Sequence, residues 1–342
     1  EIAQCLVGSE MCIRDSYKKE ATAQQPATSK EEGNLVAFSG PDFKATFDKQ
    51  SGLLTSYLYK KHEYILNGQG PRPFFWRAPT DNDYGANLPV RLKAWKEASY
   101  QEPKAESFQV TPGSNATTIK VTYRFPQTDA RWDITYKIYA SGVIKVDNRF
   151  VAEGDQAPMI PRVGLRMQLP ESFTDLTYYG RGPKENYRDR RTSQFIGEYA
   201  IPVKDMYEPY VRPQENNHRT DIYWCALTDK TQRGLLLIAD RTFELNASNY
   251  PLESMDSGDT IDNSAPRTEK THHRHLTDPL PEKMVDLFID YRMMGVGGDD
   301  SWGATAHEPY LIRPGKENAI EYGFSLVPFD KKEDYKYLIR QY

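Results

Sequence analysis

The chain has 342 residues, which is long enough for one large β domain or two ordinary domains with a sizeable core. Its formal net charge is only -4, from 44 Lys and Arg against 48 Asp and Glu, so it offers no bulk basic field to hold nucleic acid or an anionic membrane. The sequence has no apolar run of about 18 residues, which excludes a membrane-spanning helix, and Cys5, Cys12 and Cys225 form neither a disulfide framework nor a metal-binding pattern.

The first 33 residues are predicted to lie outside the folded domain. Residues 1–16 lack the features of a secretory signal, and residues 7–16 resemble a translated sequencing adapter, so we expect an artefact joined to a truncated reading frame. Residues 17–33 have the polar composition of a linker or frayed terminus. The folded domain is predicted over residues 34–330, followed by a C-terminal tail over 331–342.

The first half of the domain has the alternating pattern of half-buried β-strands. Apolar and polar side chains alternate over residues 119–125 and 132–138. A turn at 140–142 then leads into a third strand over 143–150, which predicts an antiparallel meander. One short helix is predicted near residues 88–95, where Pro89 suits a first turn.

The alternating pattern returns at residues 285–291 and 320–326, on both sides of a glycine-rich turn. Aromatic residues make up 12% of the chain, including 23 tyrosines, which favours β structure with ring surfaces suited to polar ligands such as sugars. Strands separated by turns, with almost no helix, predict an all-β fold: a large antiparallel β-sandwich.

The glycine-rich turn at residues 295–303 reads GVGGDDSWG and carries one large aromatic residue, Trp302. Glycines allow positive φ and close approach of another surface, so the indole could present its apolar face to a pyranose ring. The alternative is a tight turn whose tryptophan fills the core. Asp299 and Asp300 are adjacent and cannot bracket a sugar bond as the paired carboxyl groups of a glycosidase must, so we interpret them as turn and cap formers.

Three polar blocks, at residues 75–85, 178–191 and 213–221, each allow a structural and a ligand-binding interpretation. Asp and Asn in the first block often hydrogen-bond their own backbone in loops, and the arginines of the second can pin irregular backbone through ion pairs. In the third block Glu215 is a conceivable acid with His218 as its partner, although nothing local supports that role.

His272, His273 and His275 form the only histidine cluster of the sequence. Positions 273 and 275 share a strand face, but two imidazoles without a third spaced ligand are weak evidence for zinc. A solvated or hydrogen-bonded cluster is therefore the favoured interpretation. The sequence shows no Ser-His-Asp grouping, P-loop or dinucleotide fingerprint.

Taken together, these blocks resemble the C-terminal region of the lactose-operon-type β-galactosidases of glycoside hydrolase family 2. The resemblance covers roughly residues 34–328 and keeps the order of the family's motifs, which here read RAPTDND, GRGPKENY, PQEN, HRH and MGVGGDDSW. It implies a supersandwich fold similar to that of the galactose mutarotases. It also implies a larger bacterial enzyme whose upstream barrel supplies the two catalytic glutamates and the magnesium and sodium sites, so that this chain contains no catalytic residue and no cofactor.

In that family the domain supplies a wall of the substrate cleft. The resemblance makes Trp302 the residue that stacks on the sugar, and residues 85–91, which begin with Gly85, the equivalent of a mobile loop that closes over the site. Asn82, Asp299 and Asp300 complete the predicted substrate-binding set. The implied reaction is hydrolysis of terminal β-galactosides with retention, carried out only when the domain is joined to its barrel.

Two other functions remain open from the sequence. One is a free-standing carbohydrate-binding module, and the other is a mutarotase-like epimerase that would need His218 or His275 as acid and Glu215 as base. The predicted partners are a galactoside, the upstream barrel and further copies of the enzyme, with no nucleic acid and no membrane. The sequence predicts a soluble protein and leaves open the cytoplasm or the periplasm.

Overall fold

The computed structural model describes residues 25–152, 159–258, 275–300, 303–313, 315, 317, 319–331 and 333–341. These residues build two antiparallel sheets of very different size. The smaller sheet is a five-stranded meander in chain order, formed by β1 (Thr28–Glu32), β2 (Leu35–Ser39), β3 (Phe43–Asp48), β4 (Leu54–Tyr59) and β5 (His62–Glu63).

The larger sheet has twelve strands, and nine of them follow the order β13-β12-β14-β15-β17-β10-β9-β8-β7. The bounds of these nine are β7 (Ala105–Thr111), β8 (Thr117–Phe125), β9 (Ala130–Ile138), β10 (Ile144–Ala152), β12 (Asp175–Gly182), β13 (Phe195–Pro202), β14 (Arg219–Thr228), β15 (Gly234–Ser248) and β17 (Ile320–Phe329). The remaining three, β6 (Arg72–Phe74), β11 (Arg162–Pro170) and β16 (Met284–Met293), form a branch that joins the sheet at β15.

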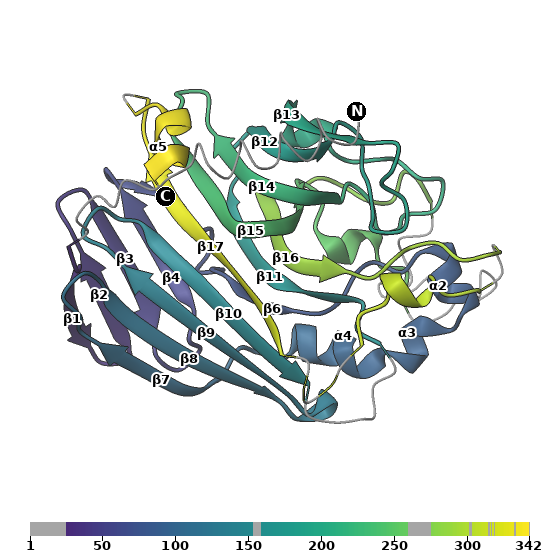
Figure 1. The fold of residues 1–342 in the computed structure, drawn as a ribbon, viewed down its shortest axis with the longest axis horizontal. Helices are drawn as coiled ribbons and strands as arrows, with labels where there is room; N and C mark the ends of the chain where they lie inside the picture. Colours follow the sequence, from purple (N-terminus) through teal and green to yellow (C-terminus); the bar gives the residue numbers. More distant parts are fainter. Residues whose placement is uncertain are drawn as a thin grey trace, which may run out of the picture.

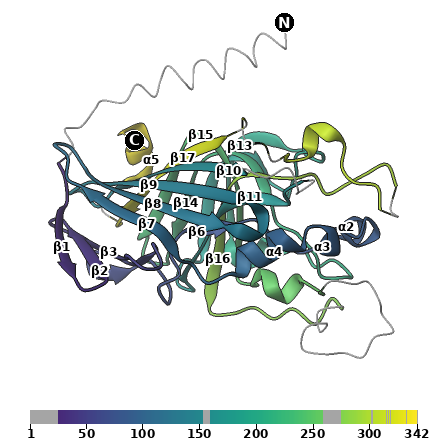
Figure 2. The same cartoon turned by 90° about the horizontal axis from the view of Figure 1, so that it is seen from below.

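The small sheet packs under the β7–β10 end of the large one, so that the two form a sandwich there (Figures 1 and 2). Phe47 of β3 meets Tyr136 of β9 with ring centroids 5.0 Å apart, and both side chains are fully buried. The Tyr57 hydroxyl donates a hydrogen bond to the carbonyl of Gly142, at the β9–β10 turn. One continuous apolar core therefore fills the space between the sheets.

Strand β15 is the branch point of the large sheet. Its first half, residues 234–239, pairs with β17, and its last part, residues 244–248, pairs with β16. Strands β16 and β17 therefore diverge, and residues 240–243 of β15 have no strand partner on that side. This split in the sheet forms a groove, described below.

Three short helices, α2 (Asp81–Gly85), α3 (Leu88–Arg91) and α4 (Lys93–Tyr100), follow one another after β6. Helix α4 closes one end of the core, where Phe75 lies at the centre of an aromatic cluster. Its ring centroid is within 5.5 Å of those of Trp95, Phe125, Trp132 and Phe150. The first polar block therefore begins with a core residue, Phe75, a few residues before its Asp-rich segment at 81–83.

The sequence-based prediction of an all-β fold is confirmed, since strands account for 47% of the structure and helices for 13%. Residues 119–125, 132–138 and 144–150 lie in β8, β9 and β10, which pair as a meander, and residues 285–291 and 320–326 lie in β16 and β17. The predicted helix is present near residue 88, although it is divided at Leu92 into α3 and α4. In the described residues, no helix is long and apolar enough to cross a membrane.

Both predicted chain-end segments need correction. Residues 28–32, assigned to the linker, form β1, which pairs with β2 even though every β1 side chain is exposed. An edge strand needs only backbone hydrogen bonds on one side, so a polar composition does not prevent it. Residues 335–341, assigned to the tail, form helix α5 (Tyr335–Gln341), because Tyr335 and the buried Ile339 pack onto a second apolar cluster that contains Trp224.

Replacing Phe75 with alanine should destabilise the fold by about 3–5 kcal/mol, because it leaves a cavity among four rings. Urea unfolding of the whole chain measures this. The matched control is Phe195→Ala on edge strand β13, where the side chain is 73% exposed and the expected change is within about 0.5 kcal/mol. Equal losses for the two variants would contradict the central position of Phe75.

Candidate functional site

The glycine-rich turn leaves β16 and is held at its start by Arg77. The guanidinium is buried, 2% exposed, and donates to the carbonyl oxygens of Met294 at 2.7 Å and Gly295 at 3.0 Å. Its other two contacts form a bidentate pair with Asp83, at 3.0 and 2.8 Å. Burial alone would lower the pKa of Arg77, but the Asp83 charge and hydrogen bonds outweigh it and raise that pKa, so the cation is firmly retained.

Asp83 also determines how helix α2 begins. Its carboxylate accepts the backbone N–H of Thr80 at 3.0 Å, and the Thr80 hydroxyl oxygen accepts the N–H of Asp83 at 3.2 Å, which completes a capping box. One carboxylate therefore caps α2 and holds Arg77 on the turn. The Asp-rich segment predicted as a loop is a capped helix for this reason.

A second contact, from the polar block at residues 178–191, also holds the turn. Asp189 accepts the backbone N–H groups of Val296 at 3.1 Å and Gly297 at 2.7 Å. A side chain at Gly295 would collide with the Asp189 carboxyl carbon and the Ala306 methyl group, both at 2.7 Å. Glycine is required at position 295 because Asp189 approaches the backbone so closely.

The far end of the turn lies against helix α2. Gly303 has φ of +128°, and a Cβ there would fall 2.4 Å from the carbonyl carbon of Gly85. Position 303 therefore needs glycine for its conformation and for the close approach. The structure thus brings the predicted site residue Gly85 into direct contact with the turn that carries Trp302.

A hollow of about 200 Å³ lies between α2 and the start of the turn. Asn82 lines it from α2, Val296 lines it from the turn, and Glu215 lines it from the third polar block. The other lining residues are Thr80, Asp81, Tyr187, Arg190, Tyr210 and Gln214. All three polar blocks and the turn therefore meet around one small polar hollow.

Trp302 and its neighbour Ser301 lie outside the described residues, so the choice between sugar platform and core plug stays a prediction. Asp300 accepts the backbone N–H of Ala304 at 3.0 Å, as expected of a turn former. Asp299 is exposed and pairs with His307 at 2.7 Å. Both aspartates lie on the same turn, adjacent to the segment that contacts α2.

Residues 85–91 do not form an extended loop. Gly85 ends α2, Asn87 takes a left-handed conformation with φ of 55°, and residues 88–91 form α3. Leu88 and Pro89 are buried, so apolar contacts anchor the segment. In this chain the implied equivalent of a closing loop is thus the end of α2, a two-residue link and the short helix α3.

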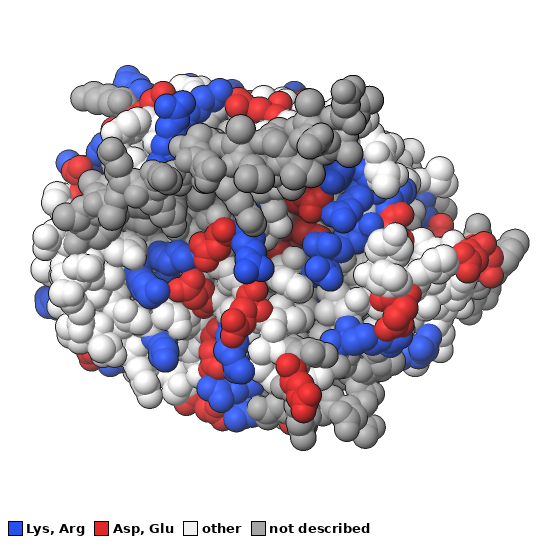
Figure 3. Space-filling view, in the orientation of Figure 1, with Lys and Arg blue, Asp and Glu red and all other residues white. Residues whose placement is uncertain are grey.

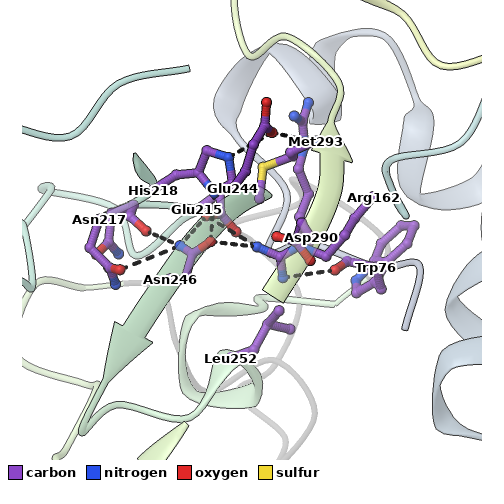
Figure 4. Close-up of polar contacts among 12 residues, drawn as sticks. Trp76, Arg162, Glu215, Asn217, His218, Glu244, Asn246, Leu252, Asp290 and Met293 are labelled. Atoms are coloured by element: carbon purple, nitrogen blue, oxygen red, sulfur yellow. Dashed lines mark hydrogen bonds and ion pairs between the residues drawn. The ribbon is translucent and has the colours of Figure 1, made fainter. Parts of the chain in front are cut away.

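Beneath the hollow lies a buried network of charged side chains (Figure 4). His218 contacts the Asn246 side-chain oxygen through Nδ1 at 2.6 Å and the Glu244 carboxylate through Nε2 at 2.9 Å. Glu244 also accepts from Arg188 at 2.6 Å and from the backbone N–H of Met293 at 2.7 Å. Since both imidazole nitrogens face oxygen acceptors, the geometry fits a doubly protonated imidazolium.

The pKa shifts of this pair agree with that geometry. Burial would lower the pKa of His218, but the hydrogen bond and charge of Glu244 outweigh it, and the pKa is raised. Burial would raise the pKa of Glu244, but the contacts with His218, Arg188 and the Met293 N–H lower it. Both shifts stabilise the ion pair in the folded state.

The second half of the network centres on Arg162. Its guanidinium donates to the Asn246 side-chain oxygen at 2.8 Å and lies 3.2 Å from Asp290 and 3.7 Å from Glu215. Asn246 in turn donates to Glu215 at 3.0 Å. Burial raises the pKa of Asp290 to about 7, because the attraction of Arg162 and His218 only partly offsets it.

The network places Glu215 and His218 together, joined through Asn246, but away from water. The exposed fraction of the Glu215 side chain is 3% and that of His218 is 1%. His275 is exposed, and none of the hydrogen bonds or ion pairs found for Glu215 or His218 involves it. The arrangement therefore supplies no accessible acid and base for an epimerase.

No group of three His, Cys, Asp or Glu side chains among the described residues is placed to hold a metal ion. His272 and His273 lie outside those residues. The backbone N–H of His275 donates to Asp278 at 2.9 Å. This bond involves the backbone of His275 and not its imidazole, so the solvated or hydrogen-bonded interpretation of the histidine cluster stays a prediction.

Several residues of the site were missed by the sequence analysis. Arg77 and Asp189 stand inside polar blocks that were noted, but no local pattern indicates that they reach the turn. Asp290 lies on the face of β16 opposite to the apolar residues, which predicts exposure, yet it is 0% exposed because Arg162 of β11 covers it. Asp290 is buried because β16 pairs with β11, a strand far away in the sequence, and residue spacing gives no signal for such a pairing.

Asp290→Asn should become progressively more stable than the parent chain as pH rises from about 4 to 7. Asp290 releases its proton near its ordinary pKa of 3.8 when unfolded but near 7 when folded, so its ionisation destabilises the folded parent across that window. The free energy of unfolding of the variant, minus that of the parent, should rise by about 1 kcal/mol per pH unit. Urea unfolding at four pH values measures it, and parallel curves would contradict the raised pKa.

Comparison with known proteins gives a family match across most of the domain. Residues 39–326 match the family model described as "Beta galactosidase small chain". The β-galactosidase of Priestia megaterium is 33% identical over 291 residues, which cover 85% of this chain and 26% of that protein. The β-galactosidase of Lactobacillus delbrueckii subsp. bulgaricus is 32% identical, over 81% of this chain and 26% of that protein.

The chain therefore spans about a quarter of the length of these curated relatives. Among solved structures, a galactose 1-epimerase from Lactobacillus acidophilus is similar with a TM-score of 0.46, at 6% identity, over 89% of this chain and 97% of that one. A putative aldose 1-epimerase from Escherichia coli gives a TM-score of 0.44 at 9% identity, over 86% and 99% of the two chains. On the family match and the sequence identity, this chain belongs to the β-galactosidase small-chain family.

Proposed function

We propose that this chain forms one wall of the substrate site of a β-galactosidase of glycoside hydrolase family 2. The complete enzyme would hydrolyse terminal β-galactosides with retention, using two glutamates and the magnesium and sodium sites of a barrel outside this chain. The family match and the 33% identity to a β-galactosidase support this activity for the larger protein. On its own the chain is proposed to be inactive.

One structural observation carries the proposal: the glycine-rich turn and helix α2 are locked together as a preformed surface. Arg77 joins them through Asp83 and the carbonyls of residues 294 and 295, and Asp189 holds the amides of residues 296 and 297. Glycosidase rates depend on holding the sugar in one orientation, and a rigid wall supplies this without loss of entropy on binding. Trp302, between Asp300 and Gly303, is proposed to stack on the sugar face.

The buried carboxyl groups beneath this surface favour a structural role over a catalytic one. Glu215, Glu244 and Asp290 are 5% exposed or less, and each faces Arg162, Arg188 or His218. A general acid or nucleophile must reach the glycosidic bond. In a retaining glycosidase, the two catalytic carboxyl groups lie on either side of that bond, about 5 Å from each other. These carboxylates are committed to internal contacts, so the proposed chemistry is assigned to the rest of the enzyme.

A chimera tests the function. Residues 39–326 would replace the matching segment of the Priestia megaterium enzyme, and hydrolysis of o-nitrophenyl β-galactoside would be compared with that of this chain alone. We expect hydrolysis by the chimera and none by the isolated chain. Hydrolysis by the isolated chain, or a folded chimera without activity, would contradict the proposal, and galactoside binding by the isolated chain with an inactive chimera would favour a free-standing binding module.

Two glycine variants of the chimera test whether the turn must pack on α2. Gly303→Ala places a Cβ 2.4 Å from the carbonyl carbon of Gly85. The control is Gly33→Ala, which is also at positive φ but whose Cβ meets nothing within 4 Å. To include residue 33, the transplanted segment is extended to residues 25–326. We expect Gly303→Ala to lower kcat/KM by on the order of tenfold or more, because small displacements of positioning groups strongly reduce rates. Gly33→Ala should leave kcat/KM unchanged, and equal kinetics for both would refute the role of the contact.

Trp302→Ala in the same chimera should raise KM for lactose substantially, since stacking on indole is worth roughly 1 to 3 kcal/mol. Trp302→Phe retains a smaller ring and should recover part of the loss. Steady-state kinetics of the three proteins measure the effect. An unchanged KM for Trp302→Ala would rule out the sugar-platform role.

A further inference from the structure

A large groove of about 1050 Å³ lies on the large sheet, at the split between β16 and β17. Its walls come from β7, β8, β9, β10, β15, β16 and β17. Asp240, Arg241 and Thr242 line it from the part of β15 that has no strand partner. Figure 3 shows basic and acidic side chains gathered over this face of the large sheet, in the orientation of Figure 1.

The acidic side chains that line the groove are already neutralised. Asp133 pairs with Arg131 at 2.9 Å, Asp240 with Lys145 at 2.5 Å and Glu321 with Arg149 at 3.3 Å. Asp147 pairs with Lys145 and Lys137, at 3.2 and 3.3 Å. No acidic lining residue is therefore left to balance additional cations.

Two arginines in the groove lack such partners. Within the described part of the chain, no carboxylate forms an ion pair with Arg241 or Arg292. The Arg292 Nε is buried and has no hydrogen-bond acceptor among the described residues, and the guanidinium of Arg292 lies 5.1 Å from the centre of the Tyr291 ring. Burial, and then the charges of Arg188 and Arg191, lower the pKa of Arg292. A bound anion would therefore stabilise the charged form of Arg292 and supply the missing acceptor.

The rest of the lining suits a carbohydrate. Tyr291 and Tyr322 line the groove with ring centroids 6.1 Å apart, and tyrosine rings combine an apolar face with a polar edge. The remaining uncharged polar side chains of the lining are Ser107, Gln109, Thr122, Thr135, Asn148 and Thr242. Hydroxyl and amide groups of this kind hydrogen-bond sugar hydroxyls.

We propose that this groove binds an acidic carbohydrate, with a carboxylate of the ligand on Arg292 and Arg241 and its sugar rings beside Tyr291 and Tyr322. The guanidinium fork matches a carboxylate in a bidentate geometry, which fixes orientation as well as charge. The volume of about 1050 Å³ leaves room for more than one sugar unit in addition to the bound carboxylate. None of the lining residues belongs to the turn at 295–303 or to helix α2, so the site does not depend on the proposed galactosidase function.

Calorimetric titration of the full chain with trigalacturonate and with neutral galactotriose tests the site. Trigalacturonate should bind at least about tenfold more tightly, because charged hydrogen bonds add more than about 1.4 kcal/mol. The double variant Arg241→Gln/Arg292→Gln should lose about tenfold or more in affinity for trigalacturonate. The matched control Arg313→Gln removes an exposed arginine paired with Glu308 outside the groove and should bind like the parent chain.

Three results would overturn the proposal. The first is that the parent chain binds the acidic and neutral trisaccharides with equal affinity, or that the double variant and the Arg313→Gln control bind trigalacturonate equally while both keep the melting temperature of the parent chain. The second is inorganic sulfate displacing trigalacturonate at equal concentration, which would mean that the groove recognises charge alone. The third is binding by the isolated chain but not by the galactosidase chimera, which would mean that another part of the enzyme occupies the groove.

Discussion

The ion pair between Arg77 and Asp83 is the interaction on which the candidate site depends. A buried guanidinium with two carbonyl acceptors and one bidentate carboxylate uses four of its five N–H donors. Removing either partner would leave an uncompensated charge in the interior, which generally costs about 3–5 kcal/mol. The pair therefore sets the distance between α2 and the glycine-rich turn, and with it the shape of the hollow.

The same logic applies to the network below the hollow. Arg162, Arg188 and His218 face Glu215, Glu244 and Asp290, so each cation of this buried cluster lies beside at least one carboxyl group. Such pairing lowers the cost of burial without making the cluster a large source of stability, since well-packed apolar residues often do as well. Its better-supported effect is to fix positions, because strands β11, β15 and β16 and the third polar block are each held by at least one of these contacts.

Sequence patterns predicted the part of the fold that rests on local periodicity. Residues 119–150 alternate cleanly because one face of β8, β9 and β10 meets the core and the other meets solvent. The same rule failed at Asp286 and Asp290, since β16 is covered on both faces and its acids meet Arg166 and Arg162. The exposed strand β1 escaped prediction for the opposite reason, because its register comes from backbone pairing with β2 alone.

For the site, the sequence located the segments but not their contacts. The blocks around Asn82, Glu215 and Gly295 were singled out for their composition, and the structure brings all of them to one hollow. The clamps by Arg77 and Asp189 join residues 217 and 107 positions apart, and composition carries no information on such separations. The family resemblance supplied part of this missing information, because several motifs in the family's order indicate a fold that no single motif identifies.

The buried network also connects the two surfaces. Arg188 lines the groove and contacts Glu244 at 2.6 Å; the path continues through His218 and Asn246 to Glu215, which lines the hollow beside the turn. Coupling between two sites needs an element with two arrangements of similar energy, and a cluster with these short, charged contacts favours one. The network is therefore better understood as a rigid spacer, which keeps the groove and the hollow in fixed register while each surface binds independently.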